Sequence, residues 1–120
     1  FDKELNFLYG TIFIDKASKK EYHSKNVCVF ANGEVDRSPT GTGVSARIAV
    51  HYARNEIALG TPITIESIIG TTFTVRAIEK TKTGKYDAVI PEVQGSANII
   101  GKNSFWIDPQ DKNGQGFILK

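Results

Sequence analysis

A chain of 120 residues with 40% hydrophobic and 23% charged side chains fits a single globular domain that buries well over half of the surface exposed by its unfolded form. Its net charge of +2 is too small for a nucleic-acid-binding surface, and its single cysteine excludes an internal disulfide. No segment approaches the roughly 20 apolar residues of a membrane span. We therefore expect, by default, a cytoplasmic protein that binds neither nucleic acid nor membrane.

Two strands are expected in the first quarter of the chain. Residues 5–14 carry large apolar side chains around Gly10, which is typical of a strand with a bend or a close backbone contact. Residues 26–31 form a short apolar strand that ends at the turn dipeptide Asn32-Gly33. Cys28 lies between two valines in this strand, so we expect a buried structural thiol rather than a nucleophile.

One helix follows, from Gly43 to Ala58, where apolar residues recur with helical spacing. These side chains cover most of the helix circumference, so the helix is expected to be mostly buried. Gly60 and Pro62 mark its end. The rest of the circumference is one polar stripe of Arg47, His51, Arg54 and Asn55.

Only strand patterns, separated by glycines and turn residues, follow the helix. They cover residues 63–69, 72–79, 86–93, 97–100, 104–107 and 117–119. One helix among many strands predicts an α+β domain, residues 1–120, in which a curved mixed β-sheet or barrel wraps around one central helix.

The segment that leads into the helix carries the chemistry. Asp36 supplies a carboxylate, Pro39 stiffens the turn, and Gly41 and Gly43 let a ligand approach the backbone. Because N–H groups at a helix start bind anions, the loop offers a carboxylate for a cation and amides for an anion. An amino acid carries both charges. The alternative is purely structural, with Thr42 capping the helix and Asp36 capping a turn.

The string Asp36-Arg37-Ser38-Pro39-Thr40-Gly41-Thr42-Gly43 resembles the second active-site loop of the proline racemase family, in which cysteine stands at the position of Thr40. Four other segments resemble the C-terminal part of family members, in the same order: residues 10–13, 66–73, 93–97 and 114–117. The resemblance implies one half of a two-domain fold like that of proline racemase and diaminopimelate epimerase, with the active site between the domains. We therefore expect the C-terminal half of a longer enzyme, whose N-terminal domain carries the first catalytic cysteine.

The resemblance also implies roles for the loop residues. Asp36 would bind the ring nitrogen of an imino acid substrate, the amides of Gly41 and Thr42 its carboxylate, and Thr40 would take the catalytic position of the second cysteine. A thiol with a pKa of about 8.5 can act as a base, whereas a threonine hydroxyl cannot. The implied reaction is therefore the one-base dehydration of trans-3-hydroxy-L-proline to 1-pyrroline-2-carboxylate, without a cofactor or metal. The 120-residue fragment alone is expected to be inactive.

Other interpretations stay open. The protein could instead be a proline racemase or a 4-hydroxyproline epimerase, the fragment could bind imino acids without catalysis, and a homodimer is possible. Gly41, Gly43 and Ala46 match a dinucleotide-binding fingerprint, but residues 34–39 separate it from the preceding strand. His23 and His51 lack partners at metal-binding spacing, so no zinc site is expected.

Overall fold

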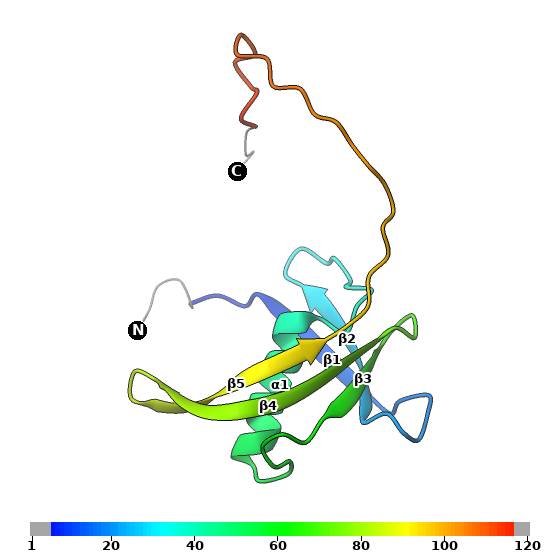
Figure 1. Cartoon of the computed structure of the whole chain (residues 1–120), viewed down its shortest axis with the longest axis vertical. Helices are drawn as coiled ribbons and strands as arrows, with labels where there is room; N and C mark the ends of the chain where they lie inside the picture. Colours follow the sequence, from blue (N-terminus) through cyan, green and yellow to red (C-terminus); the bar gives the residue numbers. More distant parts are fainter. Residues whose placement is uncertain (1–5, 117–120) are drawn as a thin grey trace.

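The computed structural model describes residues 6–116 and contains five strands and one helix (Figure 1). Their order is the predicted one for the first six elements, and the boundaries differ from the predicted ones by a few residues. The elements are β1 (Gly10–Asp15), β2 (Ser24–Phe30), α1 (Gly41–Ala53), β3 (Ile63–Ser67), β4 (Thr72–Thr83) and β5 (Tyr86–Gln94).

The strands form one mixed sheet in sequence order, β1-β2-β3-β4-β5. Neighbouring strands are antiparallel except β2 and β3, which are parallel because α1 carries the chain back between them. The sheet is open, with β1 and β5 as its edges, so the barrel alternative is wrong. Pro91 fits this position of β5, since a residue without an N–H group is tolerated in an edge strand.

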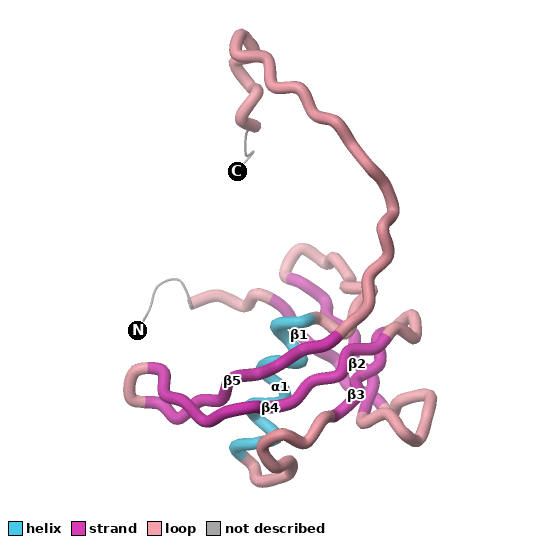
Figure 2. Tube along the Cα trace, viewed as in Figure 1, coloured by secondary structure: helices cyan, strands magenta, loops and turns pink. Residues whose placement is uncertain are grey.

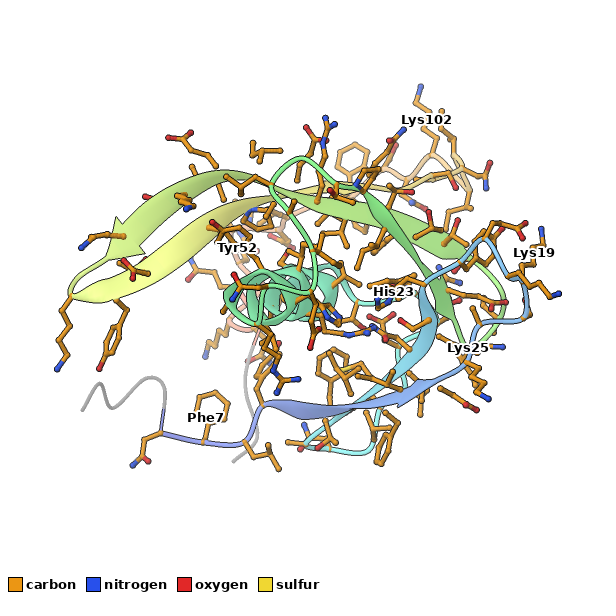
Figure 3. The ribbon with its side chains drawn as sticks, turned by 90° about the horizontal axis from the view of Figure 1, so that it is seen from below. Phe7, Lys19, His23, Lys25, Tyr52 and Lys102 are labelled. Carbon is orange, nitrogen blue, oxygen red and sulfur yellow. The ribbon has the colours of Figure 1, made fainter. Side chains whose placement is uncertain are left out.

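The sheet curves around α1 and buries one face of it. Seen from below in Figure 3, β4 and β5 pass over one side of the helix while β1 and β2 pass along the other. The core consists of Val44 and Ile48 from α1, Ile65 from β3, and Val75 and Ala77 from β4. Only Gly43, Val44 and Ile48 of the helix are buried, so the prediction of a mostly buried helix is wrong. The described part of the chain contains no helix long and apolar enough to cross a membrane.

The chain beyond β5 contradicts two of the predicted strands. Residues 95–107 contain neither helix nor strand and run away from the sheet as an extended chain (Figure 2). Strands at 97–100 and 104–107 are therefore absent, because no neighbouring strand pairs with this backbone and an unpaired backbone forms no sheet. The strand predicted at 117–119 lies outside the described residues.

The chain buries less surface than its length predicts. Its accessible surface is 10190 Å², whereas the unfolded form of a 13.2 kDa chain exposes about 19,000 Å². Slightly less than half of the unfolded surface is thus buried, and the prediction of well over half is wrong. The extended segment after β5 contributes to the difference, since its large apolar side chains are 80–99% exposed.

Candidate functional site

The loop before α1 is closed by hydrogen bonds among its own side chains. Asp36 Oδ1 accepts from the backbone N–H of Ser38 at 2.8 Å, and Asp36 Oδ2 accepts from the hydroxyl of Thr40 at 2.9 Å. The Ser38 hydroxyl in turn accepts from the N–H of Thr40 at 3.0 Å. Asp, Ser and Thr side chains make such short-range bonds readily, so the loop conformation follows largely from its local sequence.

Asp36 is held in its ionised form. Its partial burial alone would raise the pKa, but hydrogen bonds from Ser38 and Thr40, together with the charge of Arg37, lower the pKa below the ordinary value for aspartate. The Thr40 hydroxyl directs its proton toward this carboxylate. The lowered pKa makes the Asp36 carboxylate a weaker base than an ordinary aspartate. The pair presents negative charge and hydroxyl lone pairs to the space before the helix.

Thr40 has a strained backbone. Its φ of 66° lies in the left-handed region that β-branched residues rarely enter, at a cost of about 1–3 kcal/mol. The surroundings hold it there: Thr40 is 5% exposed, and its carbonyl accepts from Val44 N–H at 2.9 Å. Strain of this kind persists where the surrounding structure fixes the residue, and it is concentrated at functional sites.

The start of α1 has unused N–H groups. Thr40 is the N-cap residue, but its side chain makes no capping hydrogen bond, and the first turn carries no acidic residue. Among residues 6–116, no hydrogen bond engages the N–H groups of Gly41, Thr42 or Gly43. These groups and the helix dipole favour a bound anion. The purely structural alternative holds for Asp36, which does cap a turn, and fails for Thr42, which is not the cap.

The two loop glycines, Gly41 and Gly43, have different structural roles. A Cβ atom on Gly41 would meet no atom within 4 Å, so the space beside its Cα is open. A Cβ atom on Gly43 would clash with Cδ1 of Ile12 in β1. Gly41 is thus the glycine that keeps the helix start open to a ligand, whereas Gly43 allows α1 to pack against the sheet.

Long-range contacts anchor the loop from β2, and the sequence did not predict them. The Asn26 side-chain amide, 1% exposed, donates to the Pro39 carbonyl at 3.3 Å and accepts from Arg47 at 2.6 Å. Arg47 also donates to Ser24 at 2.9 Å, and its burial lowers its pKa. Arg47 of the predicted polar stripe therefore faces β2 instead of water. Asn26 holds the peptide that precedes Thr40.

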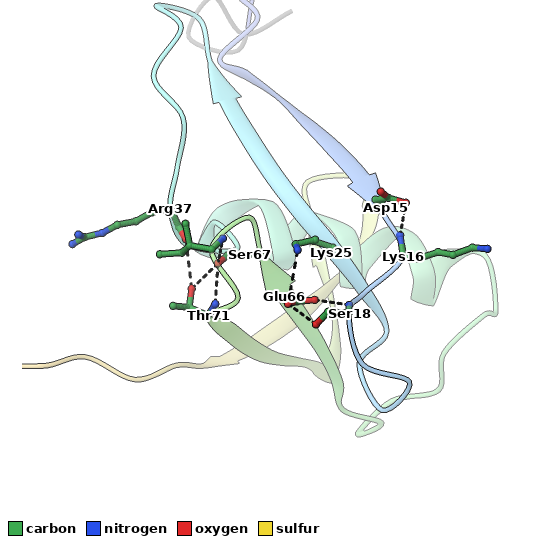
Figure 4. Close-up of polar contacts among 9 residues, drawn as sticks. Asp15, Lys16, Ser18, Lys25, Arg37, Glu66, Ser67 and Thr71 are labelled. Atoms are coloured by element: carbon green, nitrogen blue, oxygen red, sulfur yellow. Dashed lines mark hydrogen bonds and ion pairs between the residues drawn. The ribbon is translucent and has the colours of Figure 1, made fainter.

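The turn between β3 and β4 supports the loop from the other side. The Thr71 hydroxyl bonds the Ser67 hydroxyl, with 2.7 Å between the two oxygens, and donates to the Arg37 carbonyl at 3.5 Å. Figure 4 draws both contacts. Nearby Glu66, 4% exposed, accepts from the N–H and hydroxyl of Ser18. These bonds lower the Glu66 pKa. The site loop is thus fixed on two sides by β2 and by this turn.

A shallow concavity of about 160 Å³ lies at the helix start. Thr40, Thr42 and Gly43 line one side, and Cys28 lies in its floor at 4% exposure, buried as predicted. Tyr9, Gly10, Ile12 and Phe30 complete its lining.

The structure also bears on the two remaining interpretations, a dinucleotide site and a zinc site. Strands β2 and β3 are parallel with α1 between them, so a βαβ arrangement does exist. However, ten residues separate β2 from α1, and Glu66 near the end of β3 is engaged by Ser18, so a dinucleotide site is not supported. His23 and His51 do meet, with ring centroids 4.9 Å apart. Still, residues 6–116 hold no group of three His, Cys, Asp or Glu side chains placed for a metal.

Comparison with known proteins gives consistent matches. The sequence matches the proline racemase family over residues 2–118. It is 54% identical over 117 residues to a trans-3-hydroxy-L-proline dehydratase of Colwellia psychrerythraea, covering 98% of this chain and 33% of that protein. It is 47% identical over 105 residues to a proline racemase of Acetoanaerobium sticklandii, covering 88% of this chain and 31% of that protein.

Solved structures agree with the sequence matches. A crystal structure of a hydroxyproline epimerase from Agrobacterium vitis, with bound trans-4-hydroxy-L-proline, superposes with a TM-score of 0.75 at 33% identity. The superposition covers 92% of this chain and 31% of that one. The chain thus spans about a third of the length of the relatives it matches.

Proposed function

The chain belongs to the proline racemase family, and on that premise we propose that the full-length protein dehydrates trans-3-hydroxy-L-proline to 1-pyrroline-2-carboxylate. Identity alone does not select this reaction, because relatives named as dehydratase and as racemase match at 54% and 47%. The observation that carries the proposal is Thr40, which stands where the family motif has a thiol and which directs its hydroxyl proton to Asp36.

In this proposal the helix start binds the substrate carboxylate. The open N–H groups of Gly41 and Thr42 suit an anion. The Asp36 carboxylate accepts two hydrogen bonds within the loop, which leaves capacity for a further donor. That donor is the ring ammonium of the imino acid. Opposite charges on the loop then fix the orientation of the ring.

The chemical step needs one base, which this loop does not supply. We assign it to the catalytic cysteine of the N-terminal domain, implied by the family resemblance. The thiolate removes Hα, the C–H electron pair forms the Cα–Cβ double bond, and the C3–O bond breaks. The departing hydroxyl lies on the same ring face as Hα, so it takes the proton back from the newly formed thiol and leaves as water, which regenerates the thiolate. The enamine then tautomerises to 1-pyrroline-2-carboxylate. The Thr40 hydroxyl orients the ring and takes no proton from Cα.

The same geometry argues against a racemase. Racemisation needs a proton donor on the face of Cα opposite the base. Thr40 occupies the position of that donor, and a threonine hydroxyl does not ionise at neutral pH. Binding without turnover is the activity we assign to the 120-residue chain by itself, because one face of the site is present without the opposing base.

The test is an assay of the full-length protein, dialysed against a chelator and given no cofactor, with trans-3-hydroxy-L-proline as substrate. One 1-pyrroline-2-carboxylate should form for each substrate consumed. The matched control is cis-3-hydroxy-L-proline, whose hydroxyl lies on the face opposite Hα, and it should react far more slowly. Loss of activity in chelator that returns with a metal ion would refute the proposed mechanism.

A further inference from the structure

The Asn26 side chain, which anchors the site loop, has its orientation set by Arg47. A guanidinium carries only donors, so the oxygen of the Asn26 amide faces Arg47, at 2.6 Å from Nη1. This leaves the amide nitrogen to donate to the Pro39 carbonyl at 3.3 Å. If the amide were turned over, its oxygen and the Pro39 carbonyl would face each other as two acceptors. Arg47 thus selects the orientation in which Asn26 holds the loop.

The bond from Asn26 acts on the peptide that sets the backbone of Thr40. Pro39 is fully buried and its carbonyl accepts from Asn26, while the Thr40 N–H donates to the Ser38 hydroxyl at 3.0 Å. Both polar groups of this peptide are therefore engaged, which holds Thr40 at its φ of 66°. The open N–H groups at the helix start follow directly. A rotation of this peptide would therefore move the anion site.

Arg47 itself is held by β2 and by its own helix. Its Nη1 donates to Ser24 at 2.9 Å as well as to Asn26, and both partners are buried. Its Nη2 lies 3.4 Å from Nε2 of His51, since residues four apart in a helix share one face. Because Arg47 only donates, Nε2 of His51 accepts, and the neutral ring carries its proton on Nδ1.

The C-terminal end of α1 fixes this form of His51. Asn55 has a φ of 58° and donates from its N–H to the Tyr52 carbonyl at 2.9 Å, and the Glu56 N–H donates to the His51 carbonyl at 3.0 Å. These are the two bonds of a Schellman motif. The motif brings the Glu56 carboxylate to Nδ1 of His51, and the bond between them lowers the Glu56 pKa. The acceptor nitrogen of His51 is thereby presented to Arg47.

We propose that Arg47 is a positioning residue of the substrate-binding site: held by His51, it acts through Asn26 on the backbone of the site loop and so sets the affinity for substrate. We call the connected residues the relay: Glu56, His51, Arg47, Asn26 and Pro39. The proposal rests on the proposed function, because it takes the loop as the substrate-binding element. The hydrogen bonds of Arg47 all go to protein groups, so it acts on the substrate only through the loop.

Replacing Arg47 in the full-length protein is the first test. Arg47→Met keeps an unbranched apolar stem for packing and removes every donor. KM for trans-3-hydroxy-L-proline should rise about fivefold, the effect of one misplaced hydrogen bond, with kcat near the wild-type value because the base lies elsewhere. The matched control is Arg54→Met, since Arg54 is an exposed arginine at the end of the same helix; it should keep the wild-type KM. A wild-type KM in Arg47→Met overturns the proposal.

A double-mutant cycle separates positioning from general stabilisation. Asn26→Ala removes the bond to the loop that Arg47 is proposed to orient. The double variant, Arg47→Met with Asn26→Ala, should therefore show about the same fivefold rise in KM as either single variant. Independent effects would instead multiply to a rise of about 25-fold. That result would show that Arg47 does not act through Asn26, and it overturns the proposal.

His51 gives a second pair of variants, which tests the relay even if Arg47→Met does not fold. His51→Gln keeps a carbonyl oxygen that can accept from Arg47, whereas His51→Phe has no acceptor. KM should rise about twofold in His51→Phe, the size of one side-chain pair on a helix, and should stay at the wild-type value in His51→Gln. Equal KM values in the two variants overturn the relay.

Failure of the proposed function would look different from failure of the relay. A wild-type protein that forms D-proline from L-proline, and no 1-pyrroline-2-carboxylate, would refute the dehydration. The KM ratios of the same variants would then be measured with L-proline, and the expected values are unchanged.

Discussion

Replacing Asp36 by asparagine in the full-length protein should weaken substrate recognition while the loop stays folded. Asparagine keeps a carbonyl oxygen that can accept from Ser38 N–H, the 2.8 Å bond of the wild type, and its amide can donate to the Thr40 hydroxyl. What disappears is the negative charge. The melting temperature should therefore change little, whereas binding of a ring ammonium should suffer.

The size of the effect follows from the position of Asp36. Two unit charges 4 Å apart attract by about 1 kcal/mol in bulk water and about 4 kcal/mol at the effective dielectric constant of a protein surface. Because Asp36 is half-buried, we take about 2 kcal/mol, which corresponds to a roughly 30-fold loss of kcat/KM for trans-3-hydroxy-L-proline. Most of this loss should appear as a higher KM.

The assay is steady-state dehydration, with Asp111→Asn as the matched control. Asp111 accepts from Asn113 N–H at 2.9 Å in the same kind of turn, outside the site loop. That variant should keep the wild-type kcat/KM. If Asp36→Asn also stays within about threefold of the wild type, then Asp36 does not bind the substrate cation.

Three further outcomes are expected. Thr40→Cys should add exchange of Hα with solvent deuterium, measured by NMR, and some epimerisation of proline, measured by chiral chromatography. If the variant inverts no proline, geometry and not the missing thiol blocks inversion. Gly41→Ala should keep the melting temperature, since the added methyl group meets no protein atom. It should raise KM about tenfold, because the methyl group crowds the substrate carboxylate at the helix start. An unchanged KM would contradict the anion site. Asn26→Asp keeps an acceptor for Arg47 but no longer donates to the Pro39 carbonyl. The value of kcat/KM should fall about fivefold, the effect of losing one hydrogen bond. Full activity would show that the bond from Asn26 to the loop is dispensable.

Acid should destabilise the protein through its hydrogen-bonded carboxylates. The pKa values of Asp36, Glu56 and Glu66 are lowered in the folded state. Their stabilisation is therefore fully present above the unfolded values of about 4 and is lost as the pH falls through the lower folded values. Urea unfolding at pH 3 to 6 should show this loss below about pH 4, and Glu66→Gln should flatten it. A profile unchanged by Glu66→Gln would contradict the role of its bonds to Ser18.

The conformation of the site loop could be predicted from the sequence because it depends on contacts between residues close together in the chain. The loop from Asp36 to Thr40 is closed by bonds between residues two and four positions apart, so its residue types were informative by themselves. The Asn26 anchor and the close contact between Gly43 and Ile12 join residues far apart in the sequence. No local pattern signals such contacts, because they depend on the register between the helix and the sheet.

The strand predictions after β5 failed for a different reason. Phe105, Trp106 and Ile107 have strand propensity, yet no strand forms there in this structure. Propensity describes the fit of a segment to a sheet, and a sheet requires a neighbouring strand. The strand prediction for 104–107 was wrong for this chain for that reason.

The central claim, a site with one base and a threonine in place of the second, is tested most directly by a competition in one tube. The full-length protein would receive equal concentrations of trans-3-hydroxy-L-proline and L-proline, with both products quantified over time. The account predicts steady formation of 1-pyrroline-2-carboxylate and no D-proline. Formation of D-proline at a rate comparable to dehydration would contradict it, because inversion requires a proton donor on the face that Thr40 occupies.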